Sequence, residues 1–167
     1  KPGEQRLEKM VSGRYMGELF GMALADLLGE KGKSYEFTSI DMSNIIVDDS
    51  KDRQQVQKIV SGRTGRTLDL ADCQQVQKLA STLVVRSARL VTASYVGIIW
   101  QLNGTGKALK QHIAIDGSVY EKMPLAKENI MQALSELLGE DAAVVDTVLE
   151  NGGSGLGAAI AAAMSQR

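Results

Sequence analysis

The glycine-rich stretch at residues 151–157, Asn-Gly-Gly-Ser-Gly-Leu-Gly, is the strongest candidate for ligand binding in the sequence. It follows a β-prone run at residues 142–149 and precedes an alanine-rich run that predicts a helix. Glycines allow a backbone to approach a ligand closely, and the unpaired N–H groups at a helix N-terminus attract anions. A strand, loop and helix of this kind fits a nucleotide, but it also fits a plain sharp turn.

The stretch matches neither of two common nucleotide-binding motifs. A dinucleotide-binding fingerprint needs an acidic residue ~20 positions further on, and no such position follows before Arg167. A P-loop ends in Gly-Lys-Ser/Thr, whereas Leu156 here is followed by Gly157 and Ala158. A nucleotide bound here would therefore be held without a lysine from this loop.

Gly13, Gly17 and Gly21 recur at four-residue spacing within a segment that has helical periodicity. Each glycine inside a helix costs ~1 kcal/mol relative to alanine, so three on one face need a reason. Close packing against another helix would supply one, and a ligand lying on the bare backbone would supply another. The spacing alone favours close packing.

The remaining reactive residue types exclude several kinds of site. One cysteine, Cys73, excludes a disulfide framework, and one histidine, His112, excludes a Cys/His zinc site. A structural role for His112 is simpler than a place in a catalytic triad, because it begins an apolar run. Glu4, Glu8 and Glu18 could act as a carboxylate pair, but they also fit a solvated helix face. No metal site is predicted.

Helical periodicity dominates the first two thirds of the sequence. It predicts helices over residues 4–11, 16–28, 53–60, about 69–101 and 126–138. Residues 33–52 are predicted to be loop with short helical pieces, and residues 61–67 a linker. The segment Gln-Gln-Val-Gln-Lys occurs at 54–58 and again at 74–78, but a repeat array needs at least three copies.

Strand patterns occur only in the last third. Asp116-Gly117 lies between Ile115 and Val119-Tyr120, and an Asp-Gly pair flanked by apolar residues predicts a β-hairpin. A further strand is predicted over 142–149, ahead of the C-terminal helix. The sequence therefore predicts an α-rich α/β domain without an internal boundary.

Composition points to a soluble globular protein: 44% of the 167 residues are hydrophobic and 23% are charged. Nineteen Lys and Arg balance 20 Asp and Glu, so the charge argues against a nucleic-acid partner. The longest nearly apolar run, residues 90–100, is shorter than the ~18 residues of a membrane span. We expect a cytoplasmic protein, and a piece of a longer one because it begins with Lys1 rather than Met.

Three stretches of the sequence resemble the eukaryotic-type hexokinase family. Residues 1–18 resemble its Asn-Pro-Gly-x-Gln, Glu-Lys and Gly-x-Tyr-x-Gly-Glu run. Residues 115–120, Ile-Asp-Gly-Ser-Val-Tyr, resemble its Val-Asp-Gly-Ser/Thr-x-Tyr hairpin, and residues 153–159 resemble its Gly-Ser-Gly-Lys/Arg-Gly-Ala-Ala adenosine motif. Arg86-Ser87-Ala88 resembles part of a family helix. The order and spacing agree along the whole chain.

The resemblance implies the C-terminal part of an actin-like ATPase (ribonuclease H-like) sugar-kinase lobe, with residues 1–167 forming one incomplete domain. The implied activity is transfer of the ATP γ-phosphoryl group to the 6-hydroxyl of a hexose such as glucose, the first step of glycolysis. In the family, the catalytic aspartate and both phosphate loops lie upstream of the segment that begins here. We therefore expect no catalytic residue in this chain, ATP and Mg²⁺ held mainly by other parts of the protein, and no activity of the chain alone.

The resemblance also implies a set of binding residues. Gln5 and Glu8 would contact the sugar, whose hydroxyls an ionised carboxylate accepts well. The nucleotide would be bordered by residues from three segments: Gly13, Arg14, Thr38, Ser154, Gly155, Leu156, Gly157 and Ala158. The implied partners are a hexose, ATP or ADP, and the remainder of the hexokinase chain, with no nucleic acid and no membrane span.

The sequence departs from the family pattern at the nucleotide side. Leu156 replaces a lysine or arginine, Ser39-Ile40 replaces Arg-Gly after Thr38, and Asn151-Gly152 replaces an acidic pair. These changes affect nucleotide affinity rather than fold. Two alternatives therefore stay open: a catalytically inactive hexokinase-like protein used for regulation or sugar sensing, and a helical interaction module without a ligand.

Overall fold

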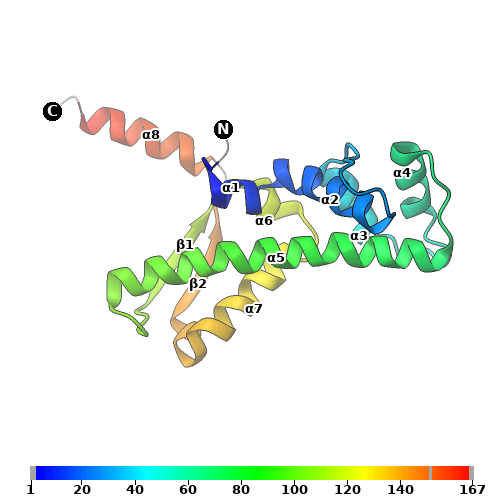
Figure 1. Ribbon diagram of the computed structural model, residues 1–167. Coiled ribbons are helices and arrows are strands. Elements are labelled where there is room, and N and C mark those ends of the chain that lie inside the picture. Colours follow the sequence, from blue (N-terminus) through cyan, green and yellow to red (C-terminus); the bar gives the residue numbers. More distant parts are fainter. Residues whose placement is uncertain (1–2, 151, 166–167) are drawn as a thin grey trace.

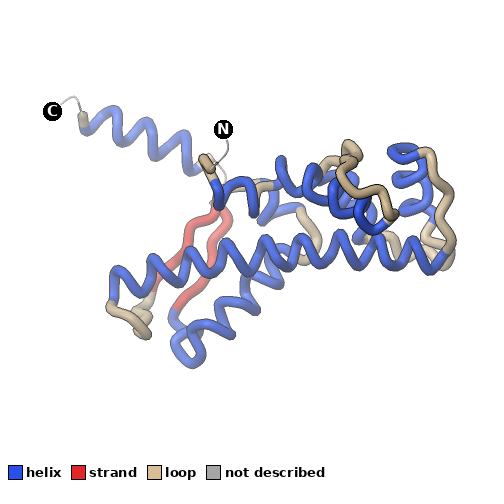
Figure 2. The backbone as a smooth tube through the Cα atoms, viewed as in Figure 1, coloured by secondary structure: helices blue, strands red, loops and turns tan. Residues whose placement is uncertain are grey.

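Helix α5 (Leu70–Asn103) spans 34 residues (Figure 1). The computed structural model describes residues 3–150 and 152–165. The other helices are α1 (Arg6–Val11), α2 (Gly13–Leu27), α3 (Ser39–Ile46), α4 (Gln54–Thr64), α6 (Ser118–Lys122), α7 (Ala126–Leu138) and α8 (Gly153–Met164). Helices α1, α2, α3, α4 and α7 pack along α5, whereas α8 extends away. A 3₁₀ helix, η1 (Gly139–Val144), precedes β2 (Val145–Leu149), which pairs with β1 (Gln111–Ile115), as Figure 2 shows.

Helix α5 begins at a side-chain cap, because the Asp69 carboxylate accepts the Asp72 N–H at 2.8 Å. Its buried face contributes to the core along the whole helix: Cys73, Val76, Ala80, Leu83, Val84, Ser87, Ala88, Thr92, Val96 and Ile99. Among the described residues, α5 is long and apolar enough to cross a membrane, a test that a core helix also passes. Its packing against α1, α2, α3, α4 and α7 accounts for that apolar composition.

Two hydrophobic clusters lie along α5. The larger joins α2, α3, α4 and the first half of α5, and its fully buried side chains include Phe20, Leu24, Met42, Ile45, Val56 and Val60. The second joins the middle of α5 to β1, α6 and α7 through Ala88, Val96, Ile115, Tyr120, Ile130 and Leu134. Each large side chain of this kind contributes about 1.5–3 kcal/mol on burial, so these clusters hold the elements in place.

Strands β1 and β2 are parallel, with His112 opposite Asp146 and Ile115 opposite Leu149. Helices α6 and α7 form the crossover between them, as parallel strands require. Ile115 faces α5 and α7, whereas His112 and Asp146 lie on the exposed face, where His112 Nδ1 and Asp146 Oδ1 form an ion pair. Because the strands are parallel, both end at the same edge of the sheet.

The predicted hairpin at Asp116-Gly117 is wrong. The chain enters α6 directly after the turn, so Val119 and Tyr120 are helical, and Gly117 has extended backbone (φ 160°, ψ 139°) instead of a hairpin turn. The short helix buries Tyr120 in the second cluster, and its hydroxyl shares a hydrogen bond with the Thr147 hydroxyl (2.7 Å). Burial of that ring and pairing with β2 outweigh the local turn preference.

The helical predictions agree with the structure, and the predicted bounds of α7 are met. The segment expected to be mostly loop contains α3, whose N-terminus carries a full capping box between Thr38 and Asp41. The predicted strand at 142–149 forms only from Val145, because residues 139–144 make the 3₁₀ helix. The structure thus confirms an α-rich α/β fold whose small sheet is late in the chain.

Candidate functional site

The turns that follow β1 and β2 meet at one edge of the sheet. Asp116 and Gly117 follow β1, and Gly152, with left-handed backbone (φ 78°), follows β2. Between the turns the Glu150 N–H donates to the Ile115 carbonyl at 2.9 Å. In open α/β sheets, ligands bind beyond the carboxyl ends of the strands. This edge of the sheet is therefore the expected position of a ligand-binding site.

The glycine stripe on α2 explains how other elements approach that edge. A β-carbon at Gly21 would overlap the carbonyl oxygen of Tyr35, and one at Gly17 would overlap that of Phe37. These two glycines therefore serve close packing, against an extended segment rather than a helix. Gly13 packs differently: a β-carbon there would lie 2.8 Å from Val119 Cγ2. The starts of α2 and α6 consequently meet at Gly13.

A pocket of about 310 Å³ opens between α3 and α6; we call it the α3–α6 pocket. It is lined by Ser39, Ile40, Ser43, Asn44, Ser118, Val119, Lys122 and Met123. Apolar surfaces from Ile40, Val119 and Met123 suit a flat ring, and the hydroxyl and amide groups can bind its polar edge. Lys122, largely exposed, adds a positive charge at the rim.

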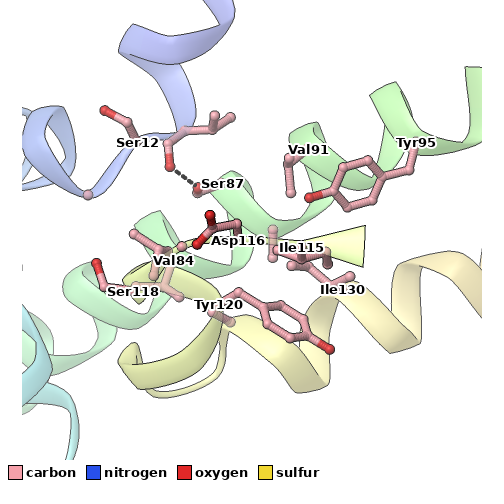
Figure 3. Close-up of a pocket in the computed structure, with 16 residues that line it drawn as sticks. Ser12, Val84, Ser87, Val91, Tyr95, Ile115, Asp116, Ser118, Tyr120 and Ile130 are labelled. Carbon is pink, nitrogen blue, oxygen red and sulfur yellow. Dashed lines mark hydrogen bonds between the residues drawn. The ribbon is translucent and has the colours of Figure 1, made fainter. Parts of the chain in front are cut away.

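A second pocket, of about 290 Å³, shares Ser118 and Val119 with the first; we call it the α5–α6 pocket (Figure 3). Its walls from α5, β1, α6 and α7 are mostly apolar. Ser87 lies at its rim and donates a hydrogen bond to the Val11 carbonyl at 2.8 Å, which ties α5 to the end of α1. The Ser12 hydroxyl oxygen is buried there and has no hydrogen-bond partner among the described residues.

Tyr95 gives the α5–α6 pocket an aromatic wall. Burial raises the pKa of its hydroxyl, and the nearby Tyr120 acts in the same direction. The hydroxyl therefore stays protonated at neutral pH and is available as a hydrogen-bond donor.

These two pockets lie within a stretch shared with known proteins. A family model described as Hexokinase matches residues 1–164. The chain belongs to the hexokinase family. Hexokinase-1 of Oryza sativa subsp. japonica is 33% identical to it, over 99% of this chain and 37% of the rice protein. Hexokinase-2, chloroplastic, of Nicotiana tabacum is 29% identical, with the same two coverages, 99% and 37%. This hexokinase-family chain thus spans just over a third of the length of these relatives.

A solved structure, the hexokinase from Schistosoma mansoni complexed with glucose, has the same arrangement of elements. The TM-score is 0.72 at 22% identity, over 89% of this chain and 35% of the Schistosoma protein. This likeness establishes the fold, and it confirms the predicted actin-like sugar-kinase class for the hexokinase-family chain.

Gln5 and Glu8, the predicted sugar-binding residues, are both exposed. Gln5 immediately precedes α1, and Glu8 lies in its first turn. Gln5 has left-handed backbone (φ 50°), as Arg53 and Leu125 do before α4 and α7. Helix α1 itself is held on α5 through Ser87 and through Arg86, whose guanidinium donates to the Met10 carbonyl at 3.4 Å. The hexokinase motif thus presents both side chains on a helix that the core supports.

Of the predicted nucleotide residues Gly13, Arg14 and Thr38, only Gly13 lines one of the two pockets. Gly13 lines the α5–α6 pocket, and Arg14 is exposed in the first turn of α2 with its guanidinium 5.7 Å from the centre of the Tyr15 ring. The Thr38 hydroxyl is occupied in the cap of α3, where it accepts the Asp41 N–H at 3.1 Å. The residues after Thr38 form the pocket wall.

The remaining predicted nucleotide residues are in α8, which extends away from the rest of the molecule (Figure 1). Gly155, Leu156, Gly157 and Ala158 are exposed and line neither pocket, and the Ser154 backbone belongs to the same first turn. Asn151, one of the departures from the family pattern, lies outside the described residues. The structure therefore brings α2, α3 and α6 together and leaves α8 apart.

Sequence reasoning missed Asp116 and Ser118 as pocket residues, together with Asn44 and Lys122. The Asp-Gly-Ser signal was present, but it was interpreted as a hairpin turn. Within residues 3–150 and 152–165, no group of three or more His, Cys, Asp or Glu side chains could hold a metal ion. Among these residues a Mg²⁺ ion would thus find no cluster of three such ligands.

Proposed function

We propose that this chain is the C-terminal part of a hexokinase large lobe, and that the whole protein phosphorylates the 6-hydroxyl of a hexose with ATP, the first step of glycolysis. The observation that carries the proposal is the α3–α6 pocket, which lies beside the carboxyl edge of the sheet in a chain of this family. Residues from two separated segments, 39–44 and 118–123, line it, and Gly13 packs beside them against Val119.

The adenosine of ATP occupies the α3–α6 pocket. The ring lies between Ile40 and Val119, and Asn44 and Ser39 bind its polar edge. The phosphates point toward the start of α2, where the helix dipole and the Arg14 cation favour an anion. The first turn of α8, residues 154–158, closes over the nucleoside when the site is filled.

The hexose binds at α1. The Glu8 carboxylate accepts hydrogen bonds from two sugar hydroxyls, and the Gln5 amide lies beside it. The Schistosoma relative, whose structure contains glucose, supports a hexose as the ligand.

The groups that move the proton and stabilise the transferring phosphoryl come from outside these residues. Phosphoryl transfer depends on positioning and on charge stabilisation, and in the family the groups that supply most of both lie upstream of this segment. We expect no turnover from the 167 residues alone. The apolar α5–α6 pocket and the exposed apolar side of α8 then receive the rest of the lobe.

A catalytically inactive, sugar-sensing hexokinase-like protein is the second candidate. One observation favours it: Leu156, which stands where the family pattern has a cation, is exposed at the nucleotide side. A protein that binds sugar but holds ATP weakly would tolerate that change.

A coupled assay for ADP release separates the two candidates. The full-length protein that contains this segment is given ATP and Mg²⁺, with and without glucose. Hexose-dependent turnover supports the kinase; a folded protein that binds glucose without turnover supports the sensor. Glu8→Ala should abolish glucose-dependent turnover because a polar site loses its sugar contact, whereas Glu140→Ala, exposed at the opposite end of β2, should retain it. An unchanged rate in Glu8→Ala would remove Glu8 from the mechanism.

We also propose a cytoplasmic location, from the reduced single cysteine and the charge balance. The tobacco relative is chloroplastic by name, so cell fractionation with antibody detection of the native protein provides the test. Recovery with a plastid or other organelle marker would contradict the proposal.

A further inference from the structure

The first turn of α3 is held from outside by an arginine of α4. Asp41 Oδ2 accepts three hydrogen bonds: from the Thr38 N–H at 2.9 Å, from the Thr38 hydroxyl at 2.9 Å and from Arg63 Nη2 at 2.9 Å. The bond from the Thr38 N–H and the return bond from the Asp41 N–H to the Thr38 hydroxyl (3.1 Å) form the capping box that starts α3. Arg63, 22 residues later, thus binds the same carboxylate oxygen that fixes the helix start.

The other end of α3 is held independently. Gln77 Nε2 of α5 donates to the carbonyl oxygens of Ile45, Ile46 and Asp48 at 3.0, 3.1 and 2.9 Å. Met42 and Ile45 are fully buried in the larger cluster. Removing the Arg63 contact would therefore release the N-terminal turn of α3 while its C-terminal end stays anchored.

The N-terminal turn of α3 carries two of the four α3 residues that line the α3–α6 pocket, Ser39 and Ile40. Ser39, Ile40, Ser43 and Asn44 all lie within the first six residues of the helix. Arg63 lines neither of the two pockets. Its influence on a bound nucleoside must consequently pass through Asp41 and the position of the helix.

We propose that Arg63 is a positioning residue for the nucleotide: through Asp41, it sets the distance between α3 and α6 and thereby the width of the nucleoside pocket. This inference rests on the proposed nucleotide role of the α3–α6 pocket. The proposal adds to the nucleotide site a residue of α4, a helix that does not line the pocket.

The chain contains a closely matched ion pair for comparison. Arg66, three residues after Arg63, pairs with Glu30 in the loop that follows α2. The two pairs are equally accessible: the arginine side chains are 41% and 47% exposed, and the carboxylates 16% and 15%. Arg66→Ala removes the same charge without releasing the cap of α3.

The experiment compares ADP dissociation constants by calorimetry, and KM for ATP and for glucose, in the full-length protein. Arg63→Ala should weaken ADP binding and raise KM for ATP about three- to fivefold, the range that a half-exposed ion pair can supply. KM for glucose should not change. Arg66→Ala should change neither the ADP dissociation constant nor the KM for ATP, although both alanine variants lower the melting temperature. Arg63→Lys should bind ADP with an affinity between those of Arg63→Ala and the wild type.

A double-mutant cycle tests whether the effect passes through Asp41. Asp41→Ala combined with Arg63→Ala should bind ADP no more weakly than Asp41→Ala alone, because each change breaks the same contact. Additive losses, unchanged ADP binding in Arg63→Ala, or an equal loss in Arg66→Ala would each overturn the positioning role. A wild-type protein that binds no ADP would instead overturn the proposed function, and the inference with it.

Discussion

Gly13 at the start of α2 leaves no room for a side chain beside Val119 of α6, since a β-carbon at residue 13 would lie 2.8 Å from Val119 Cγ2. The same β-carbon would lie 3.7 Å from Ser39 Oγ at the start of α3. Three helix starts, from parts of the chain far apart in sequence, therefore converge on one glycine. Val119 and Ser39, the residues nearest to Gly13, both line the α3–α6 pocket.

Gly13→Ala should weaken ADP binding by about three- to tenfold, because the added methyl pushes Val119 toward the α3–α6 pocket. Calorimetric titration with ADP measures the change. Val119→Ala makes room for the methyl, so Gly13→Ala should cost little affinity when it is introduced into Val119→Ala. A loss of equal size in both backgrounds would show that the contact with Val119 is not the cause.

Gly17→Ala and Gly21→Ala should destabilise the fold by about 3 kcal/mol or more, at the upper end of overpacking costs. Their methyl groups would overlap the carbonyl oxygens of Phe37 and Tyr35, which belong to the backbone and cannot rotate away. Gly97→Ala, in α5, meets no atom within 4 Å and should stabilise the helix by up to about 1 kcal/mol. Urea unfolding followed by circular dichroism compares the three. Similar stabilities for Gly21→Ala and Gly97→Ala would contradict the packing described.

Leu156→Lys should tighten ADP binding up to about fivefold at low salt, since it returns a cation to the turn that closes over the nucleoside. The gain should shrink as ionic strength rises. Leu137→Lys adds the same charge to an exposed position of α7 and serves as the control. If both lysines change the ADP dissociation constant equally, α8 is not part of the nucleotide site.

Glu30 should make stability depend on acid pH. Hydrogen bonds from Tyr35, then from Lys33 and Arg66, lower the pKa of its carboxyl to about 2. A lowered pKa stabilises the fold above the ordinary carboxyl pKa, near 4.5, and that contribution is lost as pH falls toward 2. The urea midpoint of unfolding can be measured between about pH 6 and about pH 2.5. It should decline less steeply with falling pH in Glu30→Gln than in the wild type. If the wild-type and Glu30→Gln midpoints declined in parallel, the Glu30 carboxyl would have the same pKa in the folded and unfolded states.

Gln77→Ala should cost about 2–3 kcal/mol and Gln57→Ala about 1 kcal/mol or less, although both occupy the fourth position of the same five-residue segment. The Gln77 amide serves three carbonyl oxygens at the end of α3, whereas the Gln57 amide donates to one, that of Leu68, at 3.3 Å. Thermal and urea unfolding measure both. Equal costs would mean that the carbonyl oxygens of residues 45, 46 and 48 find water when Gln77 is removed.

Periodicity predicted the long helices well, because their buried faces repeat every three to four residues. Short helical pieces were predicted within residues 33–52, but the bounds of α3 were not, even though Thr38 and Asp41 carry the capping-box spacing that marks a helix start. The hairpin prediction was wrong for a different reason. Asp116-Gly117 has a local turn preference, but the conformation at Tyr120 depends on its hydrogen bond with Thr147, in a strand far along the chain. Tertiary contacts of that kind are invisible to a local pattern.

The candidate site was predictable in part only. The family motifs identified Gly13 and the segment after Thr38, and the structure places both beside a pocket. The roles of Asn44, Lys122 and Arg63 follow from the approach of α3, α6 and α4, which no spacing in the sequence encodes. The proposed site is thus a property of packing as much as of motif.

The ties between α1 and α5 have a consequence for the order of folding. Arg86 to Met10 and Ser87 to Val11 each join residues 76 positions apart, and α1 buries no residue of its own. Closing so long a loop carries an entropic cost that local helices do not have. We expect α1 to dock last, to exchange its amide hydrogens fastest and to be cut first by proteases. Binding of a hexose to Gln5 and Glu8 would then slow amide hydrogen exchange in α1. This slowing would be detected at lower hexose concentrations than any change in the global stability of the fold.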